Sequence, residues 1–242
     1  MDRTRNPTSD VAFTPSVKAV QSRHGSRHSY ARIEARGGWP SAITDELKAA
    51  LEAQTSIFMA TANAEGQPYI QHRGGPPGFL RVLDEYTIAF ADFSGNRQYV
   101  TVGNLAENPK AQLFLIDYAE LRRVKIWGTA RVVEDDEALM ARLMPKDYRA
   151  CGERVILFSV TAWDRNCSQH LPRRYDADDV AAALEERDDR IAMLEAELAA
   201  VRERGGAQAA SSAMTATIGV RPAAGPPRPC RAGSTASSPS RA

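Results

Sequence analysis

Short apolar segments separated by polar turns fill the middle of this chain, between Ser56 and Trp163. Each segment has the length of a β-strand, and most of the turns between them are short. Such turns can join antiparallel strands, whereas parallel strands need crossover connections of about a dozen residues or more. Six or more segments of this kind predict a mainly β fold, a six-stranded antiparallel barrel with flanking helices.

Charge and composition exclude several classes of protein. The chain has 242 residues and a formal net charge of +1, so it has no general attraction to nucleic acid or to membranes. It has no apolar run of bilayer-spanning length, and its N-terminus lacks the apolar core of a signal peptide. We therefore expect a cytoplasmic protein that binds neither nucleic acid nor membranes. Cys151, Cys167 and Cys230 are odd in number and widely spaced, which does not indicate a disulfide framework.

Changes in composition divide the chain into four parts. Residues 1–40 are rich in Arg, Ser, Gly and His with little periodic apolar signal, and they predict an extended arm. Residues 41–175 form the barrel domain, which opens with an amphipathic helix capped by Thr44. Residues 176–204 have a helical pattern. Residues 205–242 are rich in Ala, Gly, Ser, Pro and Arg, which predicts a disordered tail.

Short helices are expected at two further places. One follows Pro15 in the arm, and the other runs from Asp136 to Met144, with Asp135 as its cap and Pro145 as its stop. Several arginines of the arm are candidates for docking on a partner subunit, or for solvation alone: Arg23, Arg27, Arg32 and Arg36.

The helical segment from Asp178 to Arg204 carries apolar residues at alternating spacings of three and four, as a coiled coil does. This seam consists of Val180, Leu184, Ile191, Leu194, Leu198 and Val201. Arg187 interrupts it. The seam is short for an autonomous coiled coil but long enough to pair with its own copy, so we expect a homodimer.

One junction between a strand and a helix offers a seat for an anion. The apolar run Thr87–Phe90 ends in a polar turn, Asp92–Asn96, and a helix-like segment follows with Arg97 in its first turn and its end at Asn108. A helix start presents unpaired backbone N–H groups and the positive end of the helix dipole, which suit a phosphate. An ordinary strand-to-helix connection has the same local pattern, so both interpretations stay open.

Several motifs around this junction resemble those of FMN-binding split-barrel proteins related to pyridoxamine 5'-phosphate oxidase. They are the strand start T-A-N-A-E-G-Q-P-Y, the turn S-G-N-R-Q-Y, the helix end N-L-x-x-N-P and the strand W-G-T-A. The resemblance covers roughly Ile43 to Tyr175. A later segment, N-C-x-Q-H-x-P, is similar to one uncharacterised branch of that superfamily and departs from the oxidase itself. The resemblance implies a split barrel that binds FMN at the interface of a homodimer.

The same resemblance implies which residues hold the cofactor. In that family, the second strand and the turn before the helix grip the phosphate, which implies these contacts: Gln71, His72, Arg73, Ser94, Asn96, Arg97 and Gln98. The oxidase has a basic pair in the turn, whereas this chain has Gln98 as the second member. A compensating cation such as Lys125 is therefore expected. Gln169 and His170 are expected to lie over the flavin ring from the partner subunit, or else to cap the barrel.

The sequence leaves three functions open. The first is an FMN-dependent oxidoreductase that passes hydride or electrons between a reduced donor and a small substrate. The second is a split barrel that stores or senses a flavin, haem or related ligand without turnover, and the third is an enzyme with a deazaflavin in place of FMN. No residue has the pattern of a committed general acid or base. Cys167 and His170 have C-x-x-H spacing but too few companions for a metal site, so none is expected.

Overall fold

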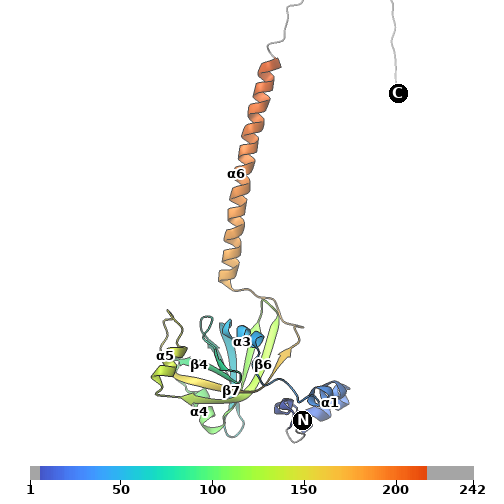
Figure 1. Cartoon of the computed structure of the whole chain (residues 1–242), viewed down its shortest axis with the longest axis vertical. Helices are drawn as coiled ribbons and strands as arrows, with labels where there is room; N and C mark the ends of the chain where they lie inside the picture. The colour runs from blue at the N-terminus through green and yellow to red at the C-terminus, as the bar shows by residue number, and fades with distance from the viewer. Residues whose placement is uncertain (1–5, 217–242) are drawn as a thin grey trace, which may run out of the picture. The chain divides into compact units, whose positions relative to one another are not determined.

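A computed structural model describes the backbone of residues 6–216 and the side chains of residues 6–205. The chain divides into two compact units, Met1–Tyr175 and Asp176–Ala242. The first unit holds a curved antiparallel sheet with short helices around it (Figure 1). The second contains the long helix α6, Ala177–Ala216.

The sheet has seven strands in the order β2-β1-β5-β6-β7-β4-β3, and every pairing is antiparallel. The strands are β1 Ser56–Ala62, β2 Pro68–Gly74, β3 Arg81–Asp84, β4 Thr87–Phe93, β5 Lys110–Asp117, β6 Arg122–Val133 and β7 Gly152–Asn166. The split-barrel prediction is confirmed, but the expected number of six strands is wrong. The seventh strand is explained by β3, a four-residue edge strand that pairs with β4 alone.

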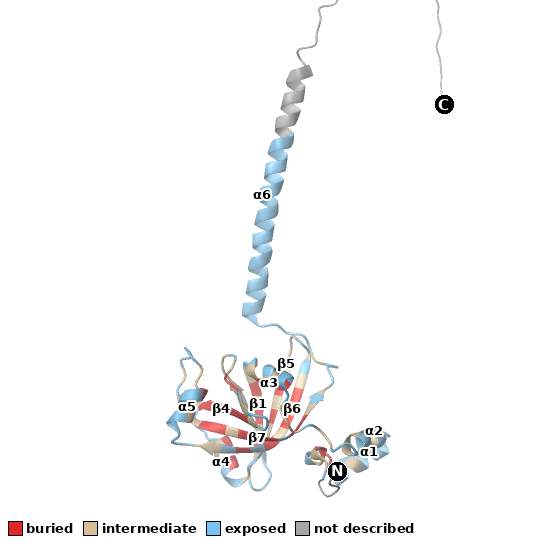
Figure 2. Ribbon diagram, viewed as in Figure 1, coloured by how far each residue is buried: buried red, intermediate tan, exposed pale blue. Residues whose placement is uncertain are grey.

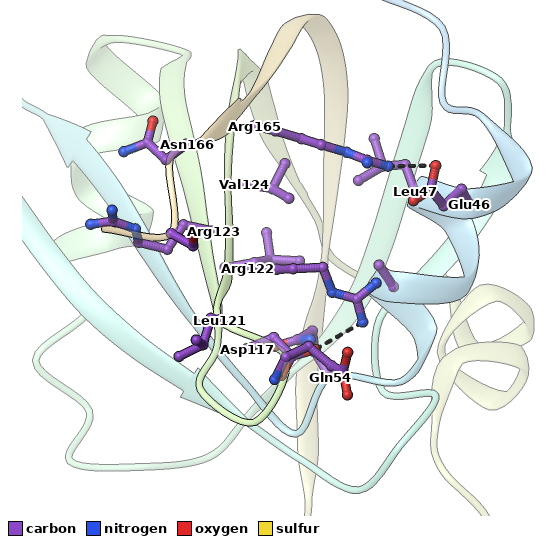
Figure 3. A pocket seen from close by; sticks show the side chains of 14 residues that line it. Glu46, Leu47, Gln54, Asp117, Leu121, Arg122, Arg123, Val124, Arg165 and Asn166 are labelled. Atoms are coloured by element: carbon purple, nitrogen blue, oxygen red, sulfur yellow. Dashed lines mark hydrogen bonds and ion pairs between the residues drawn. The ribbon is translucent and has the colours of Figure 1, made fainter. Parts of the chain in front are cut away.

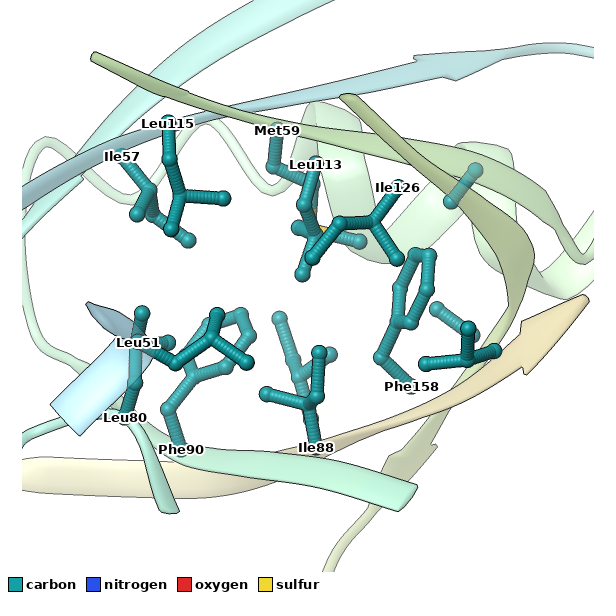
Figure 4. Close-up of a cluster of buried hydrophobic side chains, with 14 of the residues drawn as sticks. Leu51, Ile57, Met59, Leu80, Ile88, Phe90, Leu113, Leu115, Ile126 and Phe158 are labelled. Carbon is teal, nitrogen blue, oxygen red and sulfur yellow. The ribbon is translucent and has the colours of Figure 1, made fainter. Parts of the chain in front are cut away.

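A single large hydrophobic cluster fills the inside of the curved sheet. Figure 4 shows side chains from opposite walls pointing toward one another, with Ile57 and Leu113 on one wall and Ile88 and Phe90 on the other, all buried. Helix α3, Asp45–Glu52, adds Leu47 and Leu51 to this core. Burial is concentrated in the strands, while the connecting segments are exposed (Figure 2). Removal of this much apolar surface from water is the main source of the barrel's stability.

Gly128, in the W-G-T-A motif of β6, lies at a shift in the register between β6 and β7. A Cβ atom at this position would be 2.0 Å from the backbone oxygen of Ser159 and 2.7 Å from the ring of Phe158. Only glycine allows β7 to approach β6 this closely at the point where the barrel wall bends.

Two short helices of the barrel domain each begin after a residue whose side chain caps the helix with a hydrogen bond. Thr44 accepts a hydrogen bond from the backbone N–H of Leu47 at 3.2 Å, so the expected cap of α3 is confirmed. Helix α5, Glu137–Leu143, is capped by Asp136 and not by Asp135, because the Asp136 carboxylate accepts from the N–H of Leu139. Asp135 instead has a left-handed backbone, with φ at 60°.

The N-terminal segment is largely helical, which corrects the expectation of an extended arm, while the short helix expected at Pro15 is confirmed. It forms a 3-10 turn η1, Thr8–Val11, and the helices α1, Pro15–Arg23, and α2, Arg27–Glu34. Ion pairs tie these pieces together: Lys18 with Asp10 at 2.6 Å, Lys18 with Glu34 at 3.3 Å, and Arg27 with Glu34. The indole of Trp39 stacks on Trp127 of β6, with ring centroids 4.8 Å apart. Contacts that neither the local periodicity nor the composition reveals therefore order this segment.

Helix α6 is longer than expected. The helix continues through residues 205–216, which were predicted to be disordered, while residues 217–242 of the predicted tail lie outside the described residues. All the apolar residues of the seam are exposed to solvent within the chain. Between residues 6 and 216, no helix has the length and apolar character needed to cross a bilayer.

Candidate functional site

A small cavity of about 40 Å³ lies where β2, the end of β4, the following loop and the start of α4 meet. Four of the expected cofactor residues line it: Gln71, Arg73, Asn96 and Arg97. Residues 94–99 form the loop, and α4 runs from Val100 to Glu107. Arg97 therefore precedes the helix, which corrects its expected place in the first helical turn.

The loop has an unusual backbone. Arg97 and Tyr99 both have left-handed backbones, with φ at 59° and 56°, although neither is glycine. Such conformations cost on the order of 1–3 kcal/mol each and cluster at functional sites. Two hydrogen bonds hold the loop in place: Ser94 N–H donates to the Cys151 carbonyl at 2.8 Å, and Gln98 N–H donates to Asn96 Oδ1 at 3.2 Å.

The first turn of α4 borders this cavity, and the first N–H groups of a helix have no acceptor within the helix. Tyr99, the residue before the helix, makes no capping hydrogen bond with its side chain, and Thr101 and Val102 line the cavity. The Thr101 hydroxyl donates to Gln71 Oε1 at 2.9 Å. That bond leaves the amide N–H groups of Gln71 available as donors toward a ligand.

Two arginines are anchored beneath the loop. Arg73 of β2 forms an ion pair with Asp92 of β4, and their side chains are only 13% and 9% exposed. Arg154 of β7 lies opposite Asp92 in the sheet register, pairs with Glu153 at 2.6 Å, and covers the ring of Tyr99 at 4.7 Å. The Nε atoms of Arg73 and Arg154 are buried without a hydrogen-bond partner.

The two carboxylates of this cluster have opposite pKa shifts. Burial raises the pKa of Asp92 above its usual value, although Arg73 and Arg154 favour its ionised form. The hydrogen bond from the Ser94 side chain, together with Arg154, lowers the pKa of Glu153. Glu153 is the extra residue of a β-bulge, because Asp92 pairs with Arg154 and Phe93 pairs with Gly152. The bulge turns its ionised carboxylate toward the cavity.

Arg97 is the most accessible cation of the cluster. Its side chain is 70% exposed, its Nε–H donates to the Tyr99 hydroxyl at 3.0 Å, and it lies 3.8 Å from Glu153. Both contacts raise the pKa of Arg97, with the Tyr99 hydroxyl as the larger cause. An arginine whose Nε is fixed by a hydrogen bond and whose side chain is largely exposed suits a ligand that arrives from solvent.

The other expected residues lie elsewhere in the chain. His72 is on the opposite face of β2 from Gln71 and Arg73, where its Nε2 is 2.7 Å from the Ser56 hydroxyl. Lys125 pairs with Asp164 at 3.3 Å and does not line the cavity. The exposed side chains of Ser94 and Gln98 belong to the loop but are not among the cavity-lining residues.

Gln169 and His170 follow β7 and are exposed. The backbone carbonyl of Gln169 accepts a hydrogen bond from Arg123 Nη2 at 3.2 Å, and Arg123 also bonds the carbonyl of Cys167. His170 has a left-handed backbone, with φ at 61°. Within one chain, this segment does not line the cavity.

A larger pocket of about 330 Å³ lies between α3 and the ends of β5, β6 and β7. Figure 3 shows its two ion pairs, Arg122 with Asp117 at 3.0 Å and Arg165 with Glu46 at 2.6 Å. Because each of these arginines already has a carboxylate, the pocket carries no uncompensated charge from them. None of the expected cofactor residues lines it.

The sequence of the barrel matches the family described as pyridoxamine 5'-phosphate oxidase over residues 43–167, just over half of the chain. This chain belongs to the pyridoxamine 5'-phosphate oxidase family. The matched residues contain every element that lines the cavity, from β2 to the start of β7. The family assignment therefore rests on the same part of the chain as the candidate site.

Solved structures with a similar fold are found among proteins of several organisms. HupZ of Group A Streptococcus is 21% identical and aligns with 55% of this chain and 99% of its own, with a TM-score of 0.38. An FMN-binding protein of Syntrophomonas wolfei is 14% identical, with coverage of 60% and 97% and a TM-score of 0.40. General Stress Protein 26 of Bacillus anthracis is 13% identical, with coverage of 48% and 86% and a TM-score of 0.37. No curated protein matches this chain.

For a member of the pyridoxamine 5'-phosphate oxidase family, the donors at this cavity fit a phosphate group. The start of α4, the amide of Gln71 and the guanidinium of Arg97 converge there, and two buried arginine Nε atoms lie beneath. The three arginines of the cluster pair with Asp92 and Glu153 at the cavity and with Glu134, which does not line it. The cavity has room for a group of phosphate size and not for a ring system.

Some residues of the cluster at this candidate site were not predicted from the sequence. Arg154, Glu153, Asp92, Tyr99 and Thr101 all belong to the cluster, yet none was a candidate. Asp92 and Arg154 are far apart in the chain and meet only through the pairing of β4 with β7. One signal was available: an aspartate inside an otherwise apolar strand needs a cationic partner when it is buried.

Proposed function

We propose that this protein is a homodimeric FMN-dependent oxidoreductase whose cavity beside α4 holds the phosphate of the cofactor. One observation carries the proposal: an uncapped helix start, an exposed arginine and an amide converge on a cavity of phosphate size. A phosphate that binds there replaces water at donors which the protein has already fixed in place. Membership of the pyridoxamine 5'-phosphate oxidase family supports the same ligand.

Each group around the cavity has a separate part in binding. Arg97 reaches the phosphate from the solvent side, and Gln71 and the first N–H groups of α4 approach from inside the barrel. Arg73 and Arg154 stay paired with carboxylates and supply background positive charge. Glu153 opposes binding, because its ionised carboxylate competes with the phosphate for Arg97 and Arg154.

When bound, FMN supplies hydride or electron transfer, and the protein contributes orientation, hydrogen bonds and exclusion of water. Gln169 and His170 project from an exposed segment after β7. In the dimer we place this segment over the cofactor site of the other subunit, where the two side chains hydrogen-bond the ring or a substrate. The substrate is a small molecule, and a reduced donor supplies the electrons.

A second function, binding without turnover, is favoured by the state of the acidic residues. Asp92 and Glu153 are both engaged with arginines, so neither is placed to move a proton to or from a substrate. A barrel of this kind would store or sense a flavin, a deazaflavin or haem. The two functions share the cavity and differ in whether a bound flavin reacts.

The absorption spectrum of the purified protein distinguishes these functions. We expect flavin absorption bands from the protein as isolated or after addition of FMN, then bleaching by NADH or NADPH and return of the bands in air. A flavin that binds but is not bleached by either donor would support storage or sensing. A protein that binds neither FMN nor riboflavin would contradict the proposed cofactor.

A further inference from the structure

Helix α6 exposes an apolar seam, interrupted by Arg187, that no described part of the chain covers. Val180, Leu184, Ile191, Leu194 and Leu198 are between 43% and 50% exposed. In the described part of the chain, none of the charged side chains of α6 forms an ion pair within the helix. Both the apolar seam and the charges beside it are therefore available to a partner.

The spacing of the seam fixes a heptad register, with positions a to g. Leu184, Ile191 and Leu198 occupy position a, and Val180, Leu194 and Val201 occupy position d. The flanking e positions are then Asp188, Glu195 and Arg202, and the flanking g positions are Arg190, Glu197 and Arg204. These six residues determine how two copies of the helix attract or repel each other.

We propose that α6 pairs with a second copy of itself as a parallel, in-register, two-stranded coiled coil. In that arrangement, each g residue faces the e residue of the next heptad on the other helix. Arg190 then faces Glu195 of the partner subunit, and Glu197 faces Arg202 of the partner subunit. Because the dimer is symmetric, each pair forms twice, and all of these contacts are attractive.

The antiparallel arrangement that overlaps the whole seam has no such advantage. In that arrangement, g residues face g residues and e residues face e residues. Arg190 would face Glu197, which is attractive, but Asp188 would face Glu195, which is repulsive. These contacts cancel, so the charges favour the parallel orientation.

Arg187 occupies a core d position and fits the same arrangement. In a parallel coil, a d side chain packs beside the following e residue of the other helix. Each Arg187 thus has its methylene stem in the seam and its guanidinium beside Asp188 of the partner subunit. A charged residue in one core layer weakens the coil but specifies its register, because a shift by one heptad would place this charge opposite Leu194 or Val180 of the partner subunit.

Disulfide trapping tests the orientation in the full chain. We would replace the native cysteines with serine, as C151S, C167S and C230S, and introduce Val201→Cys at a d position. In the parallel coil the two copies of this cysteine meet at bonding distance, whereas in the antiparallel coil they would be about 25 Å apart. The matched control is Glu203→Cys, two residues after Val201 at the outward-facing position f. Dimerisation gives both cysteines the same local concentration.

We expect Val201→Cys to form the covalent dimer roughly tenfold or more faster than Glu203→Cys under mild oxidation. Arg190→Glu should slow trapping at Val201→Cys, because residue 190 would then repel Glu195 of the partner subunit. The added change Glu195→Arg should restore the rate, because the two charges are then opposite again. Equal rates for the two cysteines would overturn the proposal. Efficient trapping only in the variant with both Leu184→Cys and Val201→Cys would show an antiparallel coil instead.

Discussion

Arg73 and Asp92 form an ion pair between β2 and β4, two strands that have four other strands between them in the order of the sheet. The sheet curves until these strands approach, and the ion pair bridges the open side of the split barrel. The cavity beside α4 lies directly at this bridge, with Arg73 and Asp92 among its lining residues. The contact that closes the barrel therefore also positions the site.

Arg97 is the residue we expect to anchor the phosphate. Charge-assisted hydrogen bonds of this kind are worth roughly 1.5–3 kcal/mol, so Arg97→Ala should weaken FMN binding on the order of tenfold to a hundredfold. Riboflavin has no phosphate, and its affinity should stay almost unchanged. Arg97→Lys should recover only part of the loss, because it keeps the charge and loses the planar fork. Titration of flavin fluorescence with both ligands gives the answer, and equal losses for FMN and riboflavin would contradict this role.

Arg73 should matter for stability and not only for binding. Arg73→Ala leaves Asp92 buried with Arg154 3.9 Å away as its remaining cation, and breaking a buried pair in this way costs about 3 kcal/mol or more. The change raises the pKa of Asp92 further. A carboxyl group with a raised folded-state pKa contributes stability at low pH that is lost as the pH rises, so the deficit should grow as the pH rises from about 4, close to the ordinary value of 3.8, toward neutral. Urea unfolding across this range measures it.

The matched controls separate a charge effect from a packing effect. Arg97→Ala should leave the free energy of unfolding almost unchanged, because that side chain is 70% exposed. Adding Asp92→Asn to Arg73→Ala should recover part of the lost stability and remove its pH dependence. A stability deficit of Arg73→Ala that is the same at every pH would show that lost packing, and not the charge of Asp92, is responsible.

Glu153 should weaken phosphate binding. Its pKa is lowered, so it is ionised at neutral pH, and it lies 3.8 Å from Arg97. Glu153→Gln removes this competing charge and should lower the Kd for FMN roughly threefold to tenfold. Glu134→Gln is the control, because Glu134 also pairs with Arg154, at 3.6 Å, but does not line the cavity. If FMN bound more weakly to Glu153→Gln, Glu153 would be a supporting residue of the site.

Gly128 should be intolerant of any side chain. Gly128→Ala places a methyl group 2.0 Å from the backbone oxygen of Ser159, so β6 and β7 must separate, and we expect a loss of about 2–3 kcal/mol. Gly103→Ala is the matched control: this exposed glycine of α4 has no atom within 4 Å of the added Cβ, and the change should stabilise by about 0.5–1 kcal/mol. Melting temperatures of the two variants test the contrast, and a similar shift in both would refute it.

The sequence by itself determined the parts of this protein that depend on local pattern. Short apolar segments between polar turns specified the strands, and Thr44 marked the start of α3, because a cap needs only residues three positions apart. The motifs of the turn before α4 predicted a phosphate site, and the structure places a small cavity beside that turn. Composition alone failed for the N-terminal segment, whose helices are held by ion pairs such as Lys18 with Asp10 and by the stacking of Trp39.

Only the tertiary structure decided which charges belong to the site. Arg73, Asp92 and Arg154 come from three separate strands, and the pairing of β4 with β7 and the curvature of the sheet bring them together. Burial then makes their pairing obligatory, because an ionised group that leaves water needs a partner of opposite charge. Lys125 is cationic in the same sequence, yet it pairs with Asp164 in another part of the barrel. The charge of a side chain follows from the sequence, whereas its ion-pair partner depends on the distances and the burial that the fold creates.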